Sequence, residues 1–597
     1  MIVPYLFLKS FLFTILSIVN VIGYSSILNK SQFELKKNCI FSKFIYGSIF
    51  ITIISFFLNF FTSLNIFITN TFFIIFTLIG YLKFKKLILD NLKLIILVGI
   101  LSSLMTIFSN PYNDYELYHL PYMNLIRESK IIFGLSNFDF RYAHTSVFQN
   151  IAAFQYNNLM GVDSYIFYTT SLFLISLNFL YKLFKNTNST IIYLIAFISL
   201  IYFIIHGNRY GALGNDYPTH ILSIISIILY LEIKNDLKLQ KDKWFLFLSL
   251  ITILILSKFS MIFFILLPLN LILKNKFILL NKSLYLFFFV GLLFLTKNFI
   301  NSSCLVYPIP TLCLNTDWSV NEISFGSPKT ISIQSSASVK AFMESDYFLD
   351  PMIKQKFLDS KSMSKNFSNH LSNLSLSERQ ELIDYEFYLY YLKNKIWIKE
   401  YFKSKSFIKF LERIVLLNVI IFFIIVFNYK RNNESVFILN RSITIIKENL
   451  FFLIFIIFNF IFWFFNFPQL RYAISYVLIF ISIPSLLFFG LHRRDILTKP
   501  FMYIIIIALT YSISFNLIRI YNASYSGNEF NKLDNNIVPL QNKIYLKEYS
   551  NIDNFVLFQP INGVCSNTPP LCSVFTERFL KTGRSIKKGP FNYIFIR

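Results

Sequence analysis

Long apolar segments, almost free of charge, recur along the chain and are separated by short polar connections. An apolar helix of about 20 residues crosses the hydrocarbon core of a bilayer. Segments near this length lie at 3–27, 40–62, 64–82, 90–108, 163–184, 189–206, 219–234, 244–256, 260–274, 284–299, 408–428, 450–466, 473–490 and 501–520. The short segments 244–256 and 260–274 could form one re-entrant pair. The pattern therefore predicts an all-α polytopic transmembrane helix bundle of about 12–14 spans.

Basic residues are concentrated in some of the connections. These connections are Lys83–Lys86, Lys234–Lys243, Lys274–Lys282, Lys430–Lys447 and Arg493–Lys499. Lysine and arginine favour cytoplasmic loops, so this set is predicted to be cytoplasmic. Both ends of the chain then lie outside, as do the extracytoplasmic loops 109–162, 207–218, 300–407, 467–472 and 521–597.

The net charge of +25 would suggest a nucleic-acid partner in a soluble protein. Here 55% of the residues are hydrophobic and 15% are charged, and the positive charge follows the membrane topology. The sequence therefore predicts membrane lipids as partners, and no nucleic acid. It contains no zinc, P-loop, dinucleotide-binding or Ser-His-Asp signature, which argues against soluble cofactor chemistry.

The five cysteines divide according to the predicted topology. Two close pairs lie on the outer side, where disulfides form: Cys304 with Cys313, and Cys565 with Cys572. Cys39 lies on the cytoplasmic side, where thiols stay reduced. Because charge and cysteine positions agree, we expect both close pairs to be disulfides. Five unrelated thiols are the alternative.

The outer loops are long enough to fold. In loop 109–162, apolar residues recur at helical spacing from Leu117 to Ile126, which predicts an amphipathic helix lying on the membrane surface. The middle of loop 300–407 is rich in serine and lysine, so short helices mixed with mobile stretches are expected there.

The tail contains strand-like runs at Val556–Gln559 and Tyr593–Ile596, on either side of its cysteine pair. Its length is within the usual range for a small domain. The sequence thus predicts a membrane domain, 1–520, followed by a small disulfide-bearing outer domain, 521–597.

An acidic motif, Asn110 to Pro121, directly follows the fourth predicted span. It places Asp114, Glu116 and His119 at the outer boundary of the membrane. Water still solvates a carboxylate at this depth, and the carboxylate can deprotonate an acceptor hydroxyl while a second substrate stays in the lipid. Asp114 and Glu116 are therefore the candidate catalytic residues. Equally, Asn113 or Asp114 could cap a helix with Glu116 in its first turn.

A second acidic residue, Asp216, lies in the outer sequence Gly214 to His220 after the sixth predicted span. Carboxylates from two loops suit a hard divalent cation, Mg²⁺ or Mn²⁺, which would also neutralise a phosphate leaving group. Asp114 and Asp216 are the candidate metal ligands. A helix-capping role for Asp216 is the alternative.

Cationic side chains near the outer face complement these carboxylates. Lys258 lies between two apolar segments, where a charged side chain is costly. Arg471 lies in an outer turn, where its guanidinium could bind a phosphate or extend to lipid headgroups. Lys297, near the end of the tenth span, could line the same cavity, although an interfacial anchor is the simpler interpretation. With His119 and Tyr472, these residues form the predicted substrate- and phosphate-binding set.

These motifs resemble the GT-C superfamily of polytopic glycosyltransferases, which use polyprenyl-phosphate sugars. The resemblance rests on the acidic motif, the second acidic loop, and a turn of the form Phe-Phe-x-x-Pro-x-x-Arg-Tyr ending at Tyr472. It implies that Asp114 or Glu116 acts as base or metal ligand. It also implies that Asp216 fills the second acidic position and that Arg471 contacts phosphate.

A closer resemblance is to an uncharacterised group of bacterial GT-C-like membrane proteins, which implies a location in the bacterial plasma membrane. The matching pieces are Asp114–Pro121, Lys258–Ser260, Asn298–Pro308, Asp317-Trp318, Pro468–Tyr472 and Cys565–Cys572. The chain departs from the superfamily pattern because four spans precede its acidic loop, where one is usual.

Residues and resemblance together predict an inverting glycosyltransferase. It would move a sugar from a polyprenyl-phosphate-linked donor to a glycan, lipid or protein acceptor at the outer face. A transporter or flippase for a lipid-linked glycan is the alternative, and it requires polar residues in the middle of spans, where they are scarce. A third hypothesis is a non-catalytic assembly partner of a surface-polysaccharide machine.

Overall fold

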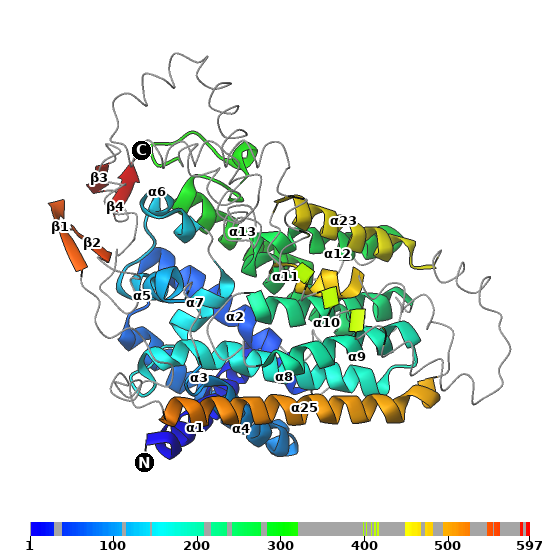
Figure 1. Ribbon diagram of the computed structural model, residues 1–597. Helices are drawn as coiled ribbons and strands as arrows, with labels where there is room; N and C mark the ends of the chain where they lie inside the picture. Colours follow the sequence, from blue (N-terminus) through cyan, green and yellow to red (C-terminus); the bar gives the residue numbers. More distant parts are fainter. Residues whose placement is uncertain are drawn as a thin grey trace, which may run out of the picture.

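The computed structural model shows a mostly helical protein whose long helices lie side by side, with shorter helices at one end (Figure 1). The described residues are 2–28, 39–109, 115–143, 146–207, 216–235, 241–275, 283–307, 309–319, 448–466, 472–480, 494–525, 546–552, 555–560, 585–588 and 593–596, with scattered helical positions between 398 and 419.

The described part of the chain from Ile2 to Ser319 is mostly helical. Its longer helices are α1 (Ile2–Tyr24), α2 (Ile40–Phe61), α3 (Ile66–Asp90), α4 (Leu92–Thr106), α8 (Ser164–Asn186), α9 (Thr190–Ile205), α10 (Asp216–Asn235), α11 (Lys241–Ser257) and α13 (Ser283–Ser302). Its shorter helices are η1 (Ser25–Ile27), η2 (Tyr115–His119), α5 (Leu120–Glu128), α6 (Leu135–Phe138), η3 (Phe140–Ala143), α7 (Val147–Phe154), η4 (Gly161–Asp163), η6 (Phe259–Ile265), α12 (Leu266–Lys274) and η8 (Pro310–Leu312).

The described residues after Ser319 include two long helices and four strands. These are α23 (Leu450–Asn466), α25 (Arg494–Tyr525), β1 (Leu546–Ile552), β2 (Phe555–Pro560), β3 (Ser585–Lys588) and β4 (Tyr593–Ile596). The strands form two antiparallel pairs, β1 with β2 and β3 with β4. The predicted strand-like runs coincide with β2 and β4, and β4 contacts α6 at the end of the bundle.

Several helices are apolar and long enough to cross a membrane, as expected for a multi-pass membrane protein. Five meet this test among the described residues: Val3–Ile27, Ile40–Phe61, Gly161–Asn186, Leu284–Ser302 and Phe501–Asn522. A sixth is obtained if α3 and α4, which meet at a bend of 95°, are taken as one broken span. Shorter apolar helices lie at Ile191–Ile205, Lys243–Ser257, Phe259–Lys274 and Leu450–Phe465. The total of 12–14 spans stays a prediction, because much of 408–428 and 473–490 lies outside the described residues.

Helix α1 is packed tightly between its neighbours, with backbone against backbone. A Cβ atom on Gly47 of α2 would overlap the carbonyl oxygen of Val21 on α1. A Cβ on Gly80 of α3 would likewise overlap the carbonyl oxygen of Val19. Small residues allow this close approach of helices in membranes, where packing rather than hydrophobicity drives association.

Helix α25, from the last quarter of the chain, packs against helices of the first half. It packs against α9 and α4, and the Nη2 atom of Arg519 donates to the carbonyl oxygens of Leu104 (2.7 Å), Met105 (3.1 Å) and Ile107 (3.1 Å). The last carbonyls of a helix have no partner within it, so a cation at this end both satisfies them and complements the helix dipole. Arg519 therefore closes the end of α4 directly before the acidic motif.

We expect Arg519→Met to lower the free energy of unfolding by about 2 kcal/mol, since hydrogen bonds to charged groups contribute roughly 1.5–3 kcal/mol. The thermal unfolding midpoint of the purified full chain measures this loss. The control is Lys83→Met, which removes the same charge from an exposed position on α3. An unchanged midpoint in Arg519→Met would show that these carbonyls need no cap.

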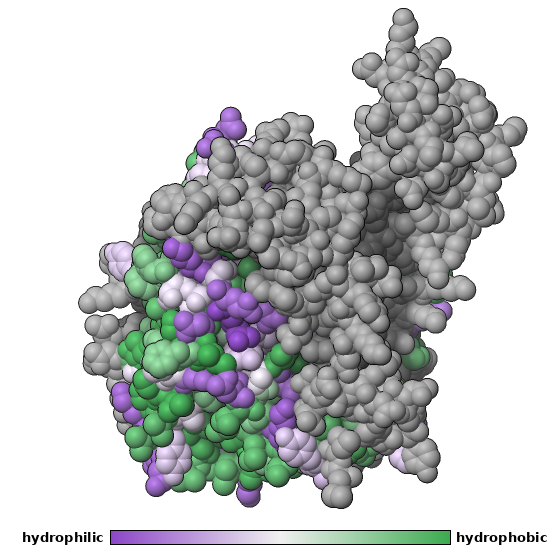
Figure 2. Space-filling model, turned by 90° about the vertical axis from the view of Figure 1, so that its left-hand side faces the viewer, coloured by the Kyte–Doolittle hydropathy of each residue, from purple (hydrophilic) through white to green (hydrophobic). Residues whose placement is uncertain are grey.

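The shorter helices of loop 109–162 lie inside the protein. All residues of α5 from Leu120 to Ile126 are buried, and α5 packs against α7, which in turn packs against α2 and α8. The predicted helix is present, but its predicted position on the membrane surface is wrong, because protein surrounds it. Figure 2 views this end of the bundle and shows hydrophilic residues gathered above a mainly apolar region.

Candidate functional site

The structure describes about half of the predicted site residues. Those whose side chains it describes are Glu116, His119, Lys258, Lys297, Tyr472, Cys304 and Cys313. Those outside the described residues are Asp114, Arg471, Cys565 and Cys572. Asp216 is described only as the first residue of α10.

His119 is held by a glutamine from α7. Gln149 caps its own helix, because its Oε1 accepts a hydrogen bond from the backbone N–H of Ser146 at 3.1 Å. This orientation directs the Nε2 of Gln149 to the Nδ1 of His119, 2.8 Å away. An amide nitrogen only donates, so Nδ1 accepts and the proton of the neutral ring lies on Nε2. Helix α7 thus holds the imidazole of His119 in one tautomer.

Glu116 lies in the π-helical turn η2, with 6% of its surface exposed. Burial, followed by the nearby charges of Tyr165, Asp163 and Glu116, raises the pKa of Tyr115. The sequence-based expectation of a water-solvated carboxylate is therefore wrong for Glu116, whose carboxylate lies among protein groups. Such a carboxylate is suited to take a proton from a substrate that excludes water.

Lys297 also points into the protein. It is 2% exposed, and its Nζ donates to the Oδ1 of Asn150 at 2.8 Å. An interfacial anchor would extend to lipid headgroups, so that interpretation of Lys297 is wrong. Helix α7 thus presents Gln149 to His119 and Asn150 to Lys297, and it brings two predicted substrate-binding residues to one short helix.

A buried ion pair adjoins this set. Arg141 donates from Nε to the Oδ1 of Asp139 at 3.0 Å and from Nη2 to its Oδ2 at 2.7 Å. Burial opposes the charge of Arg141, but the charge and hydrogen bonds of Asp139 outweigh it, so the pKa of Arg141 is raised. The guanidinium also lies 5.5 Å from the ring centre of Tyr118, the neighbour of His119. Sequence analysis missed this pair, because Asp-x-Arg in a loop has no periodicity.

The second set of contacts surrounds the break between α11 and η6. Lys258 interrupts the helix there with an extended backbone, φ −160° and ψ 131°. Its Nζ lies 3.6 Å from the ring centre of Tyr472, a cation–π contact. Two members of the predicted phosphate-binding set therefore touch, and Tyr472 directly follows Arg471 in the chain.

The first turns of α10 pack beside the contact between Lys258 and Tyr472. Thr219 and Ser257 share a hydrogen bond of 3.0 Å between their hydroxyls, and the Nδ1 of His220 lies 3.3 Å from the Oγ of Ser475. These contacts join the helix that begins at Asp216 to the residues beside Lys258 and Tyr472. Sequence reasoning missed the hydroxyl partners, because serine and threonine carry no distinctive signal.

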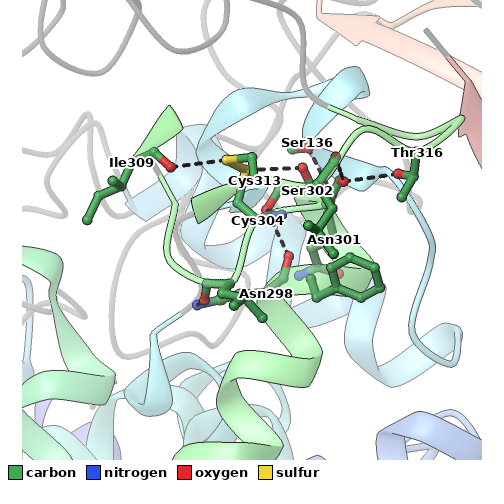
Figure 3. The surroundings of a disulfide bond; sticks show 12 residues. Ser136, Asn298, Asn301, Ser302, Cys304, Ile309, Cys313 and Thr316 are labelled. Atoms are coloured by element: carbon green, nitrogen blue, oxygen red, sulfur yellow. Dashed lines mark hydrogen bonds between the residues drawn. A yellow bond between two sulfur atoms is a disulfide. The ribbon is translucent and has the colours of Figure 1, made fainter. Parts of the chain in front are cut away.

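Cys304 and Cys313 form a disulfide across a short hairpin that follows α13. The hairpin is closed by backbone hydrogen bonds from Leu305 to Leu312 (2.9 Å) and from Leu314 to Ser303 (2.8 Å). Figure 3 shows Asn301 and Ser302 beside the disulfide, at the end of the helix that carries Lys297. The hydroxyl of Ser136 donates to the carbonyl oxygen of Asn301 at 2.8 Å. The disulfide hairpin and α6 thus fix this end of α13.

The predicted cation site stays a prediction. Within the described part of the chain, no group of three or more His, Cys, Asp or Glu residues could hold a metal ion. The carboxylates of Asp114 and Asp216, the candidate ligands, are not among the described side chains.

A family model described as "Domain of unknown function (DUF8201)" matches residues 5–348, more than half of the 597 residues. The chain belongs to this family. The DUF8201 match extends from α1 past the disulfide hairpin, so it includes His119, Lys258 and Lys297 but ends before Tyr472. No curated protein and no solved structure matches the chain.

Proposed function

We propose that this protein is a membrane glycosyltransferase of the GT-C type. It transfers a sugar from a polyprenyl-phosphate-linked donor to a glycan, lipid or protein acceptor at the outer face of a bacterial plasma membrane. The observation that carries the proposal is the contact of Lys258 with Tyr472, at the place where the helix starting at Asp216 also packs. A lysine at a helix break among apolar helices is suited to bind a lipid-linked phosphate.

The proposed reaction is a single inverting displacement. Asp114 or Glu116 takes the proton of the acceptor hydroxyl, and the oxygen attacks the anomeric carbon of the donor sugar. The new bond forms as the bond from that carbon to the phosphate oxygen breaks. The phosphate leaves with the bonding electron pair, and Lys258 and Arg471 stabilise its charge. His119 is a further candidate substrate contact.

The alternative, a transporter for a lipid-linked glycan, is favoured by a line of buried polar residues on α1. Three of the four side chains are paired, however: Thr14 donates to Ser102 at 2.9 Å, Ser10 and Thr106 lie 3.0 Å apart, and Asn20 accepts from Gln155 at 2.8 Å, whereas the hydroxyl of Ser17 has no partner among the described residues. Paired hydroxyls stabilise helix packing in membranes and need no passing substrate. We therefore prefer the enzyme.

The test is transfer by the purified full chain in proteoliposomes, with a panel of polyprenyl-phosphate sugars and a cell-envelope lipid extract as acceptor. We expect release of polyprenyl phosphate, and an increase of about tenfold in the donor KM for Lys258→Met, since cation contacts in desolvated sites contribute roughly 1–2 kcal/mol. Lys243→Met, which removes a lysine paired with Glu232 away from the site, is the control.

Movement of a lipid-linked glycan across the bilayer, without release of polyprenyl phosphate from any donor, would instead establish the transporter. Equal donor KM values for the Lys258 and Lys243 variants would remove Lys258 from the phosphate site.

A further inference from the structure

Three buried side chains near the end of α13 offer hydrogen-bond donors that no described residue uses. Lys297, Asn150 and Asn301 are 2%, 0% and 1% exposed. The Nδ2 atoms of both asparagines are buried and have no hydrogen-bond partner in the part of the chain that the structure describes. The ammonium of Lys297 has three protons, and among the described residues it donates one hydrogen bond, to Asn150.

These donors lie together. The Oδ1 of Asn150 accepts from Lys297, which fixes the amide so that its NH₂ group remains unused. Asn301 follows Lys297 by one turn of α13, and the ring centre of Tyr122 lies 5.7 Å from the Lys297 Nζ. The ring of Phe56, 4.9 Å from the same Nζ, adds an apolar wall.

Among the described residues, no carboxylate balances this ammonium. The ion pairs there are Lys9–Asp163, Arg141–Asp139 and Lys243–Glu232. A buried charge without a counter-charge is strongly destabilising, and each unused buried donor adds about 1–3 kcal/mol. A group with oxygen acceptors and negative charge would remove these costs together.

We propose that Lys297, Asn150 and Asn301 form a binding site for an oxyanion, that is, a carboxylate or phosphate group of a ligand. The site is separate from the Lys258–Tyr472 contact and is built from α13 and α7, with walls from α2 and α5. Helix α7 joins it to His119 through Gln149. The proposal does not rest on glycosyl transfer, because it concerns binding alone.

The test measures thermal unfolding of the purified full chain in a maltoside detergent at constant ionic strength. Chloride is replaced by inorganic phosphate or by acetate, and in a third arm phosphatidylglycerol is added. A ligand that binds only the folded state raises the midpoint in a saturable way. We expect such a rise in at least one arm. Phosphate or acetate would identify a soluble oxyanion, and phosphatidylglycerol alone would identify a lipid phosphate.

The variants separate this site from general salt effects, because phosphate also stabilises proteins by exclusion from their surface. We expect Lys297→Met to lose the saturable rise and the charge-matched Lys243→Met to keep it. Should Lys297→Met fail to fold, Asn301→Leu decides, since it keeps the charge and should raise the half-saturating concentration at least tenfold. No saturable rise in any arm, or an unchanged response in both site variants, would overturn the proposal.

Discussion

Gly47→Leu is expected to remove nearly all folded protein from the membrane. A Cβ at this position meets the backbone of α1 at Val21, and a carbonyl oxygen in a helix cannot turn away as a side chain can. Overpacking a core costs about 1–3 kcal/mol even where side chains can adjust. Here α1 and α2 must separate, and α1 also packs against α3, α4 and α8. The measurement is the yield of monodisperse protein after detergent extraction.

The matched control is Gly291→Leu on α13, another glycine in an apolar helix. A Cβ on Gly291 has no atom within 4 Å. We expect a yield close to that of the wild type for this variant. If Gly47→Leu were extracted as well as Gly291→Leu, the close packing of α1 against α2 would be wrong.

The second large effect concerns catalysis and rests on the proposed function. We expect Asp114→Asn and Asp216→Asn each to abolish sugar transfer without lowering the amount of protein in the membrane. Positioned general bases contribute roughly 10²–10⁴-fold to rates, so loss of the base should reduce kcat at least 100-fold. Release of polyprenyl phosphate from the labelled donor measures this loss.

Two further variants sharpen the interpretation. Glu116→Gln is compared with Asp114→Asn to decide which of the two carboxylates is the base. Only the variant that removes the base should lose activity at every pH. Asp90→Asn changes an exposed carboxylate at the end of α3 and should leave transfer intact. Full activity in both Asp114→Asn and Asp216→Asn would eliminate the mechanism.

The sequence predicted the membrane helices well, because their signal is local. The segment 40–62 is α2 and the segment 284–299 is the main part of α13, each with a boundary error of a few residues. The backbone N–H and C=O groups of an apolar segment in lipid find hydrogen-bond partners within a helix. The length and composition of the segment are therefore enough to predict a membrane helix.

The position of α5 could not be predicted in the same way. Its alternating pattern suggests a face in water, yet its polar residue Asn124 accepts a hydrogen bond from Tyr165 at 3.1 Å, inside the protein. The backbone oxygen of Ile126 accepts from Leu64 at 3.1 Å. A polar position on a helix indicates that a partner exists, and the sequence does not say whether that partner is water or protein.

The site shows the same limit. Lys258 and Tyr472 were candidates from their chemistry, but their contact depends on the packing of segments far apart in the chain. Gln149 and Asn150 carried no signal, because amides are common in helices. The tautomer of His119 follows from a capping interaction at the start of α7, which can be recognised only once the helix is placed beside the ring.

The contacts of α25 indicate that residues 5–348, the region matched by the family model, do not fold fully without α25. The family match ends at residue 348, yet the carbonyls at the end of α4 are capped by Arg519, and Phe197 of α9 stacks on Phe501 with 3.9 Å between ring centres. During synthesis these surfaces of α4 and α9 leave the ribosome before α25 and stay uncovered until α25 packs against them. A polypeptide cut at residue 348 would keep bare carbonyls and an unpaired aromatic face in lipid, so the boundary of the family is not the boundary of a folding unit.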